Sequence, residues 1–69
     1  MPLTFAETGR EFKVLKIAGK DDVCRRLADL GFVVGSPVSV VSELMGNLIV
    51  KVKDSRIAIS REMAGKILV

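Results

Sequence analysis

Histidine, tryptophan and tyrosine are absent from this 69-residue sequence, and cysteine occurs once, at Cys24. A single cysteine cannot form an internal disulfide, and a chain without histidine is a poor candidate for a zinc or non-haem iron site. We therefore expect no metal site and no cofactor. A serine nucleophile needs a neighbouring base, which no histidine can supply here, so we also expect no catalytic residues and no enzymatic activity.

Long apolar runs and blocks of one charge are missing as well. No stretch approaches the roughly 18 consecutive apolar residues of a membrane span, so we expect no direct membrane insertion. The first residues lack the basic start and apolar core of a signal peptide, which favours a cytoplasmic protein. The formal net charge is +3, from 11 Lys and Arg against 8 Asp and Glu, and it is spread along the chain. Such a distribution does not by itself indicate nucleic-acid binding.

Apolar residues are abundant, at 49% of the chain. The length predicts one domain, residues 1–69, whose fold must depend on apolar packing. A chain of this size buries only about 60% of the surface that its unfolded form exposes, so the core is expected to be thin.

One amphipathic helix is predicted over residues 22–30. Val23, Leu27 and Leu30 recur at i, i+4 and i+7, which places them on one apolar stripe. Asp21 or Asp22 is expected to cap the start of this helix through its carboxylate.

Two glycines separate this helix from a valine-rich segment. Gly31 follows the last periodic residue, where a left-handed backbone commonly ends a helix. Phe32 is then expected to fold back against Leu27. Gly35 precedes Pro37, which cannot continue a helix and belongs at the start of a strand.

The remaining segments have the pattern of short strands. A bent or bulged strand is expected over residues 12–17, with Phe12 and Val14 on one side and Leu15 and Ile17 on the other. Further strands are predicted at residues 38–44, 48–53, 56–60 and 67–69, with tight turns at 45–47 and 54–55.

Strict alternation fixes the orientation of the middle strands. Leu48, Val50 and Val52 are expected to point inward and Ile49, Lys51 and Lys53 outward, while Ile57 and Ile59 point inward from the next strand. Ser60 is expected to cap a short helical turn before the last strand. Together these elements predict a mainly β fold with one inserted α-helix. We expect a small SH3-like β-barrel of about five strands that curls to remove its edges, plus a short C-terminal helical turn.

An ordered set of residues along the whole chain resembles the FeoA family, the small components of bacterial ferrous iron transport systems. The resemblance includes "RRLADLGFVVGSPVSVV", a following "VKV" strand and the terminal "IAISREMAGKILV". The matching positions are Arg25 or Arg26, Leu27, Leu30, Gly31, Gly35, Val38, Val40, Ile57, Ala58, Ile59, Ala64, Ile67 and Val69, together with Leu3 and Gly9 near the start.

This resemblance implies a function as well as a fold. It implies an SH3-like barrel with an inserted helix, and a non-enzymatic cytoplasmic accessory protein that contacts FeoB, the membrane GTPase permease of the system. Exposed apolar and basic residues are the candidates for that contact. They are Arg25, Arg26, Leu44, Met45 and Ile49.

A small basic barrel that binds nucleic acid is the alternative. Lys51, Lys53, Arg56 and Arg61 could form a basic strip on the outer hairpin. The strip lacks the aromatic side chains on which bases stack, and alternating charges of this kind are common on solvated strand faces.

Overall fold

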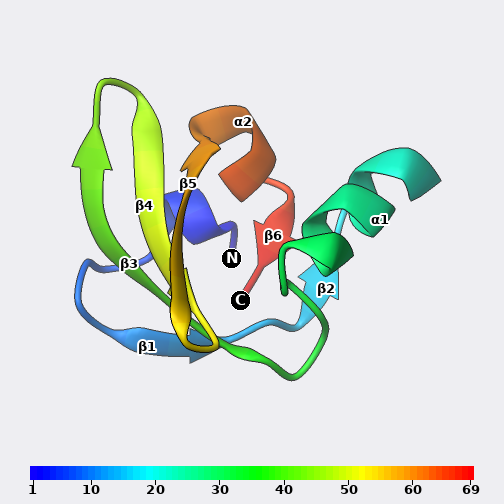
Figure 1. The fold of residues 1–69 in the computed structure, drawn as a ribbon, viewed down its shortest axis with the longest axis horizontal. Helices are drawn as coiled ribbons and strands as arrows, with labels where there is room; N and C mark the ends of the chain where they lie inside the picture. The colour runs from blue at the N-terminus through cyan, green and yellow to red at the C-terminus, as the bar shows by residue number, and fades with distance from the viewer.

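The computed structural model describes residues 1–69, and Figure 1 shows how its elements are arranged. In chain order they are η1 (Leu3–Phe5), β1 (Glu11–Lys13), β2 (Lys16–Ile17), α1 (Asp21–Asp29), β3 (Pro37–Leu44), β4 (Asn47–Val52), β5 (Ser55–Ser60), α2 (Arg61–Ala64) and β6 (Ile67–Leu68). The predicted mainly β fold, with one inserted helix and a short late helical turn, is confirmed.

The strands form two antiparallel sheets. The larger has the order β1-β3-β4-β5, and the smaller pairs β2 with β6. In Figure 1, η1, α2, β6 and α1 all lie on one side of the larger sheet, and its other face is bare. β1 and β5 are the two edges of the larger sheet, and each pairs with a strand on one side only. The expectation that the barrel would curl to remove its edges is therefore wrong as far as strand pairing is concerned.

Alternating side chains of β4 build the centre of the core, as predicted. Leu48, Val50 and Val52 are at most 3% exposed. Ile59 is also buried, but Ile57 on the same strand is only half-buried. The complete core contains Leu3, Val14, Leu27, Phe32, Val38, Val40, Leu48, Val50, Val52, Ile59, Ala64 and Ile67.

The end of α1 follows the prediction. Gly31 has φ +108°, and its N–H donates to the carbonyl of Ala28 at 2.9 Å. The N–H of Phe32 donates to the carbonyl of Leu27, also at 2.9 Å. These two bonds satisfy carbonyls that the last helical turn would otherwise leave free.

The start and the stripe of α1 differ from the prediction. Lys20 is the N-cap residue, and its own side chain makes no capping bond. Asp21 and Asp22 lie in the first turn, where a negative charge complements the helix dipole. The carboxylate of Asp22 accepts from the free N–H of Val23 at 2.9 Å, so the predicted acceptor is present further into the helix. Leu30 is 41% exposed, because Phe32 folds back under the last turn and occupies the core beside Leu27.

The strand expected over residues 12–17 is two strands in different sheets. The N–H of Val14 donates to the carbonyl of Ser36 at 3.0 Å, which continues the pairing of β1. The next N–H, of Leu15, donates to the carbonyl of Leu68 at 2.8 Å. The apolar residues shift from even to odd positions between Val14 and Leu15 because the chain changes its partner strand there. This change of partner leaves Leu15 64% exposed.

Both hairpin turns contain a non-glycine residue with positive φ. Met45 and Gly46 form the turn between β3 and β4, with φ of +52° and +81°. Lys53, with φ +55°, and Asp54 form the next turn, one residue earlier than expected. The predicted cap at Ser60 is confirmed, since its hydroxyl accepts from the N–H of Met63 at 3.1 Å.

The two ends of the chain lie together. The amino group of Met1 donates to the carbonyl of Val69 at 2.7 Å, and the N–H of Val69 donates back to the carbonyl of Met1 at 2.8 Å. Pro2 also forms a β-bridge with Leu68. None of the helices has the length and apolar character that crossing a membrane requires.

Candidate docking surface

The bare face of the larger sheet gathers most of the predicted contact residues. We call it the outer face. Cross-strand pairing places Ile49 between Ser42 and Ala58, and two residues further along places Lys51 between Ser39 and Arg56. Because side chains in directly opposed positions share a face, all of these point away from the core. With Leu44, Asn47 and their cross-strand partners, the outer face comprises Glu11, Ser39, Ser42, Leu44, Asn47, Ile49, Lys51, Arg56, Ala58 and Ser60.

A bulge in β3 brings Leu44 onto this face. The register shifts between Val40 and Ser42, so one extra residue interrupts the alternation of the strand. Val40, before the bulge, is 3% exposed, whereas Leu44, four residues later, is 62% exposed. Without the extra residue, Val40 and Leu44 would share the core side, since positions separated by an even number lie on one face.

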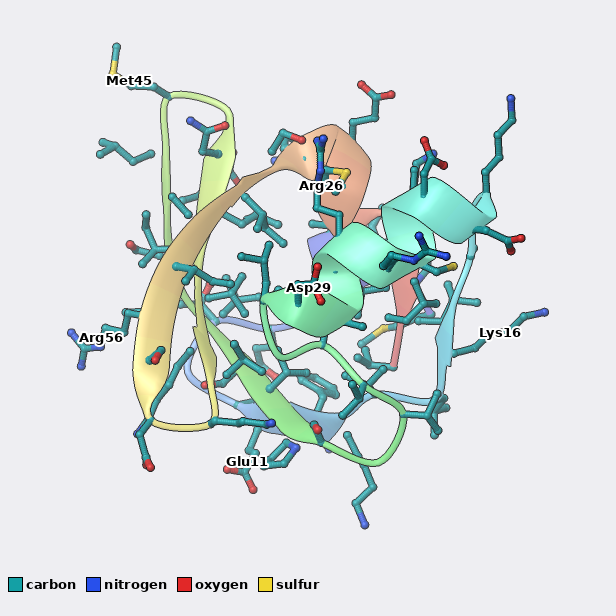
Figure 2. The ribbon with its side chains drawn as sticks, turned by 45° about the vertical axis from the view of Figure 1, so that its right-hand side comes forward. Glu11, Lys16, Arg26, Asp29, Met45 and Arg56 are labelled. Carbon is teal, nitrogen blue, oxygen red and sulfur yellow. The ribbon has the colours of Figure 1, made fainter.

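Three of the five predicted contact residues therefore lie together. Leu44 and Ile49 are on the outer face, and Met45 stands at the hairpin tip beside them, 92% exposed. Figure 2 shows Met45 directed away from the body of the molecule. Ile49 is only half-buried, in agreement with its predicted outward orientation. These side chains form an exposed apolar area at one end of the outer face.

A row of charges crosses the other half of the outer face. Lys51 lies directly opposite Arg56, and Ser39 separates Lys51 from Glu11 on β1. Like charges in directly opposed positions destabilise a sheet. The ion pairs of the chain are Arg10 with Glu7 and Arg61 with Glu43, so neither Lys51 nor Arg56 has a carboxylate partner. Arg61, paired with Glu43 at 2.7 Å, is not part of a free basic strip.

A shallow hollow lies within this charged half, with a volume of about 30 Å³. It is far smaller than the roughly 300–1,000 Å³ of small-molecule sites, so this half of the face suits contact with another surface. Its walls are Glu11, Pro37, Val38, Ser39, Lys51 and Lys53.

Arg25 and Arg26 lie elsewhere. Both are exposed on α1, and Figure 2 shows Arg26 and Asp29 on this helix while Arg56 points outward on the opposite side of β5. A groove of about 100 Å³ runs between α1 and α2, lined by Asp22, Val23, Arg26 and Met63. The structure therefore divides the predicted contact residues between two faces.

No three of the cysteine, aspartate and glutamate side chains gather where they could hold a metal ion. Cys24 is half-buried, and its thiol lies 3.7 Å from the carbonyl of Ile17 and 3.8 Å from that of Gly19. These contacts are those of a small residue at the margin of a helix.

A second exposed apolar area was not predicted. Leu15, Val33 and Val34 are 64%, 40% and 68% exposed around the loop that follows α1. The loop and Leu15 lie close together because the N–H of Gly35 donates to the carbonyl of Val14 at 2.8 Å. The shift of apolar residues from even to odd positions at 14–15 is the sequence signal for this exposure, but the bent or bulged strand that it predicts does not imply it.

Comparison with known proteins connects this geometry to a family. The model of the FeoA domain matches residues 1–69. A protein of Methanocaldococcus jannaschii named "Putative Fe(2+) transport protein A" is 40% identical over 68 residues, which cover 99% of this chain and 83% of that protein.

Solved structures share the fold. A crystal structure of an iron uptake regulatory protein, FeoA, superposes with a TM-score of 0.86 at 30% identity, covering 96% of this chain and 88% of that one. The zinc complex of Stenotrophomonas maltophilia FeoA, described as a prokaryotic SH3 domain protein, superposes with a TM-score of 0.85 at 27% identity, covering 99% and 87%. The predicted SH3-like fold is confirmed.

Proposed function

Since the chain belongs to the FeoA family of ferrous iron transport proteins, we propose that it is a non-enzymatic cytoplasmic accessory protein that docks on the FeoB membrane permease. The observation that carries this proposal is the family match, which extends over residues 1–69.

The outer face is the surface that we propose for docking. Leu44, Met45 and Ile49 offer apolar area that a partner would remove from water, at roughly 25 cal/mol per Å². Lys51 and Arg56 beside them would orient an acidic partner and speed its association. Apolar contacts bordered by charge are the usual composition of protein interfaces.

Hydrolysis of GTP would belong to the partner. The two glycines of the α1–β3 loop, Gly31 and Gly35, follow a helix, whereas phosphate-binding glycine loops precede one. No Gly-Lys-Ser/Thr sequence follows them. These residues therefore support a function by protein–protein contact, without a nucleotide site in this chain.

A binding titration tests the proposal. The purified chain would be titrated against the soluble GTP-binding part of the cognate permease, and separately against the whole permease in nanodiscs. We expect saturable binding to at least one of them, weakened by Met45→Ser and Leu44→Ser. Absence of binding to both at high micromolar concentration would contradict the proposal.

Nucleic-acid binding is the second candidate, favoured by the unpaired Lys51 and Arg56. Retention on DNA or RNA that falls steeply with salt concentration would support it. The outer face contains no aromatic side chain for stacking. Phe12 lies opposite the buried Val38, Phe32 is in the core, and the exposed Phe5 belongs to η1 on the other side of the sheet. Retention that does not change with salt would remove this candidate.

A further inference from the structure

One long edge of the larger sheet is open. β5 pairs only with β4, over Ser55–Ser60, and no hydrogen bond joins its outer side to another element. The other edge, β1, has only three residues, Glu11–Lys13. An open edge is a row of backbone donors and acceptors that another chain can pair with.

The pairing shows which backbone groups are free. In an antiparallel ladder, residues alternate between pairs that exchange hydrogen bonds and pairs that do not. The N–H of Arg61 donates to the carbonyl of Gly46 at 3.3 Å, which identifies that position as a bonded pair. Counting from it, Ile59 and Ile57 bond to β4, and the N–H and carbonyl groups of Arg56 and Ala58 point to the open side, together with the N–H of Ser60. The carbonyl of Ser60, the N-cap residue of α2, belongs to the first turn of that helix.

The edge carries few of the devices that protect edges from other chains. It contains no proline and no irregularity of register along its six residues. Ala58 is small and exposed, so it leaves the backbone accessible. Ile57 on the opposite side is only half-buried, because no strand lies beyond it to cover its outer flank. Arg56 is the one charged residue on this edge, and an edge with so little protection and an incompletely covered isoleucine favours aggregation unless a partner occupies it.

Charge identifies the chemistry of the occupant. A strand added to β5 would place alternate side chains beside Arg56 on the outer face and beside Ile57 on the core side. Arg56 and its neighbour Lys51 have no carboxylate partner within the chain. An acidic residue on the outer side of the added strand would pair with Arg56. An apolar residue on its core side would cover Ile57.

We propose that β5 is the docking edge for an extended segment of the permease, in which acidic and apolar residues alternate. This inference rests on the proposed function and adds to it the form of the contact, which is strand addition. The main-chain hydrogen bonds would come from Arg56 and Ala58, and from the N–H of Ser60. The acidic side chains would lie against Lys51 and Arg56.

A second copy of the chain fits the same edge less well. Pairing of two β5 edges would bring the Lys51 and Arg56 of both copies into one sheet, and each chain carries a net charge of +3. Repulsion between these cations opposes that pairing. A nucleic acid cannot supply the alternating donors and acceptors that the edge requires.

Ala58→Pro is the test that separates edge pairing from other contacts. The substitution removes an N–H that points to the open side, while the bonds from Ile57 and Ile59 to β4 remain, and proline is tolerated on edge strands. Ala58→Val is the matched control, since it keeps the N–H and suits a strand. Titration against the whole permease in nanodiscs, with thermal melts of each variant, provides the comparison.

We expect binding to weaken about tenfold or more in Ala58→Pro, through a lost hydrogen bond and a steric obstruction, and to change little in Ala58→Val. We also expect the amide protons of Arg56 and Ala58 in the wild-type protein to exchange more slowly in the complex. The exchange measurement decides the question if Ala58→Pro does not fold.

Equal binding by Ala58→Pro and the wild type, or unchanged exchange at Arg56 and Ala58 in the complex, would overturn strand addition while leaving docking intact. Failure of the wild type itself to bind would instead contradict the proposed function. Concentration-dependent self-association that Ala58→Pro abolishes would assign the edge to a second copy and overturn the acidic segment.

Discussion

The backbone N–H of Phe32 donates to the carbonyl of Leu27 at 2.9 Å, and both side chains are fully buried. The chain thus leaves α1 and enters the core within a single turn. Gly31, between them, makes this possible because its φ of +108° lies outside the range that other residues adopt without strain.

Gly31→Val should destabilise the protein by about 1–3 kcal/mol, because a β-branched residue would be forced into a left-handed backbone. A Cβ at this position would meet the methyl groups of Val52 at 3.6 and 3.7 Å, an ordinary contact, so the Cβ itself is accommodated. Urea denaturation would measure the loss. Gly31→Asn is the control and should cost less, since asparagine tolerates this conformation.

Ser60→Ala should cost about 1 kcal/mol, because the N–H of Met63 would lose its acceptor at the start of α2. Thermal unfolding would detect the change. Ser60→Asp retains a side-chain acceptor and adds a charge that favours a helix N-terminus, so it should restore most of the stability. Equal destabilisation by both variants would show that the cap does not account for the effect.

Met45→Asn should stabilise the protein while weakening docking. Met45 and Gly46 both have positive φ, and Asn-Gly is the preferred pair in such two-residue turns. We expect a gain of about 1 kcal/mol in the free energy of unfolding, because a left-handed backbone costs most residues roughly 1–2 kcal/mol and asparagine less. Binding to the permease should fall, since the substitution removes an apolar side chain that is 92% exposed. A stabilised variant with undiminished binding would exclude the hairpin tip from the interface.

Lys51→Glu should likewise increase the stability of the protein while weakening docking. It replaces a like-charge pair with Arg56 by an opposite-charge pair, which should add about 0.2–1 kcal/mol at low salt and less at high salt. Docking on an acidic partner should weaken. Lys16→Glu makes the same change of charge on β2, on the far side of the molecule from Arg56 in Figure 2, and should leave binding unchanged.

Local patterns in the sequence were sufficient for most of the fold. The Gly31 helix end, the Ser60 cap and the inward set of Leu48, Val50 and Val52 each depend on neighbours within a few residues, and all three are confirmed. The failures concern distant partners. The switch at Val14–Leu15 depends on where Ser36 and Leu68 lie, and periodicity along one segment carries no information about them.

In the candidate site, too, local features were predicted and features that depend on distant partners were not. Exposure of Leu44 and Met45 was predicted correctly from their place beside a turn. Their position relative to Lys51 and Arg56 depends on the register of three strands and on the bulge in β3, which the alternation of the sequence does not reveal. The separation of Arg25 and Arg26 from them depends on how α1 packs.

The mutual hydrogen bonds between Met1 and Val69 leave the termini adjacent, and Figure 1 shows both near the middle of the view, away from the β3–β4 tip. Residues 1–69 could therefore be inserted into a loop of a host protein, or ligated head to tail into a ring, with little rearrangement. A purification tag fused at either terminus would emerge from one common point, which leaves the outer face accessible to immobilised partners.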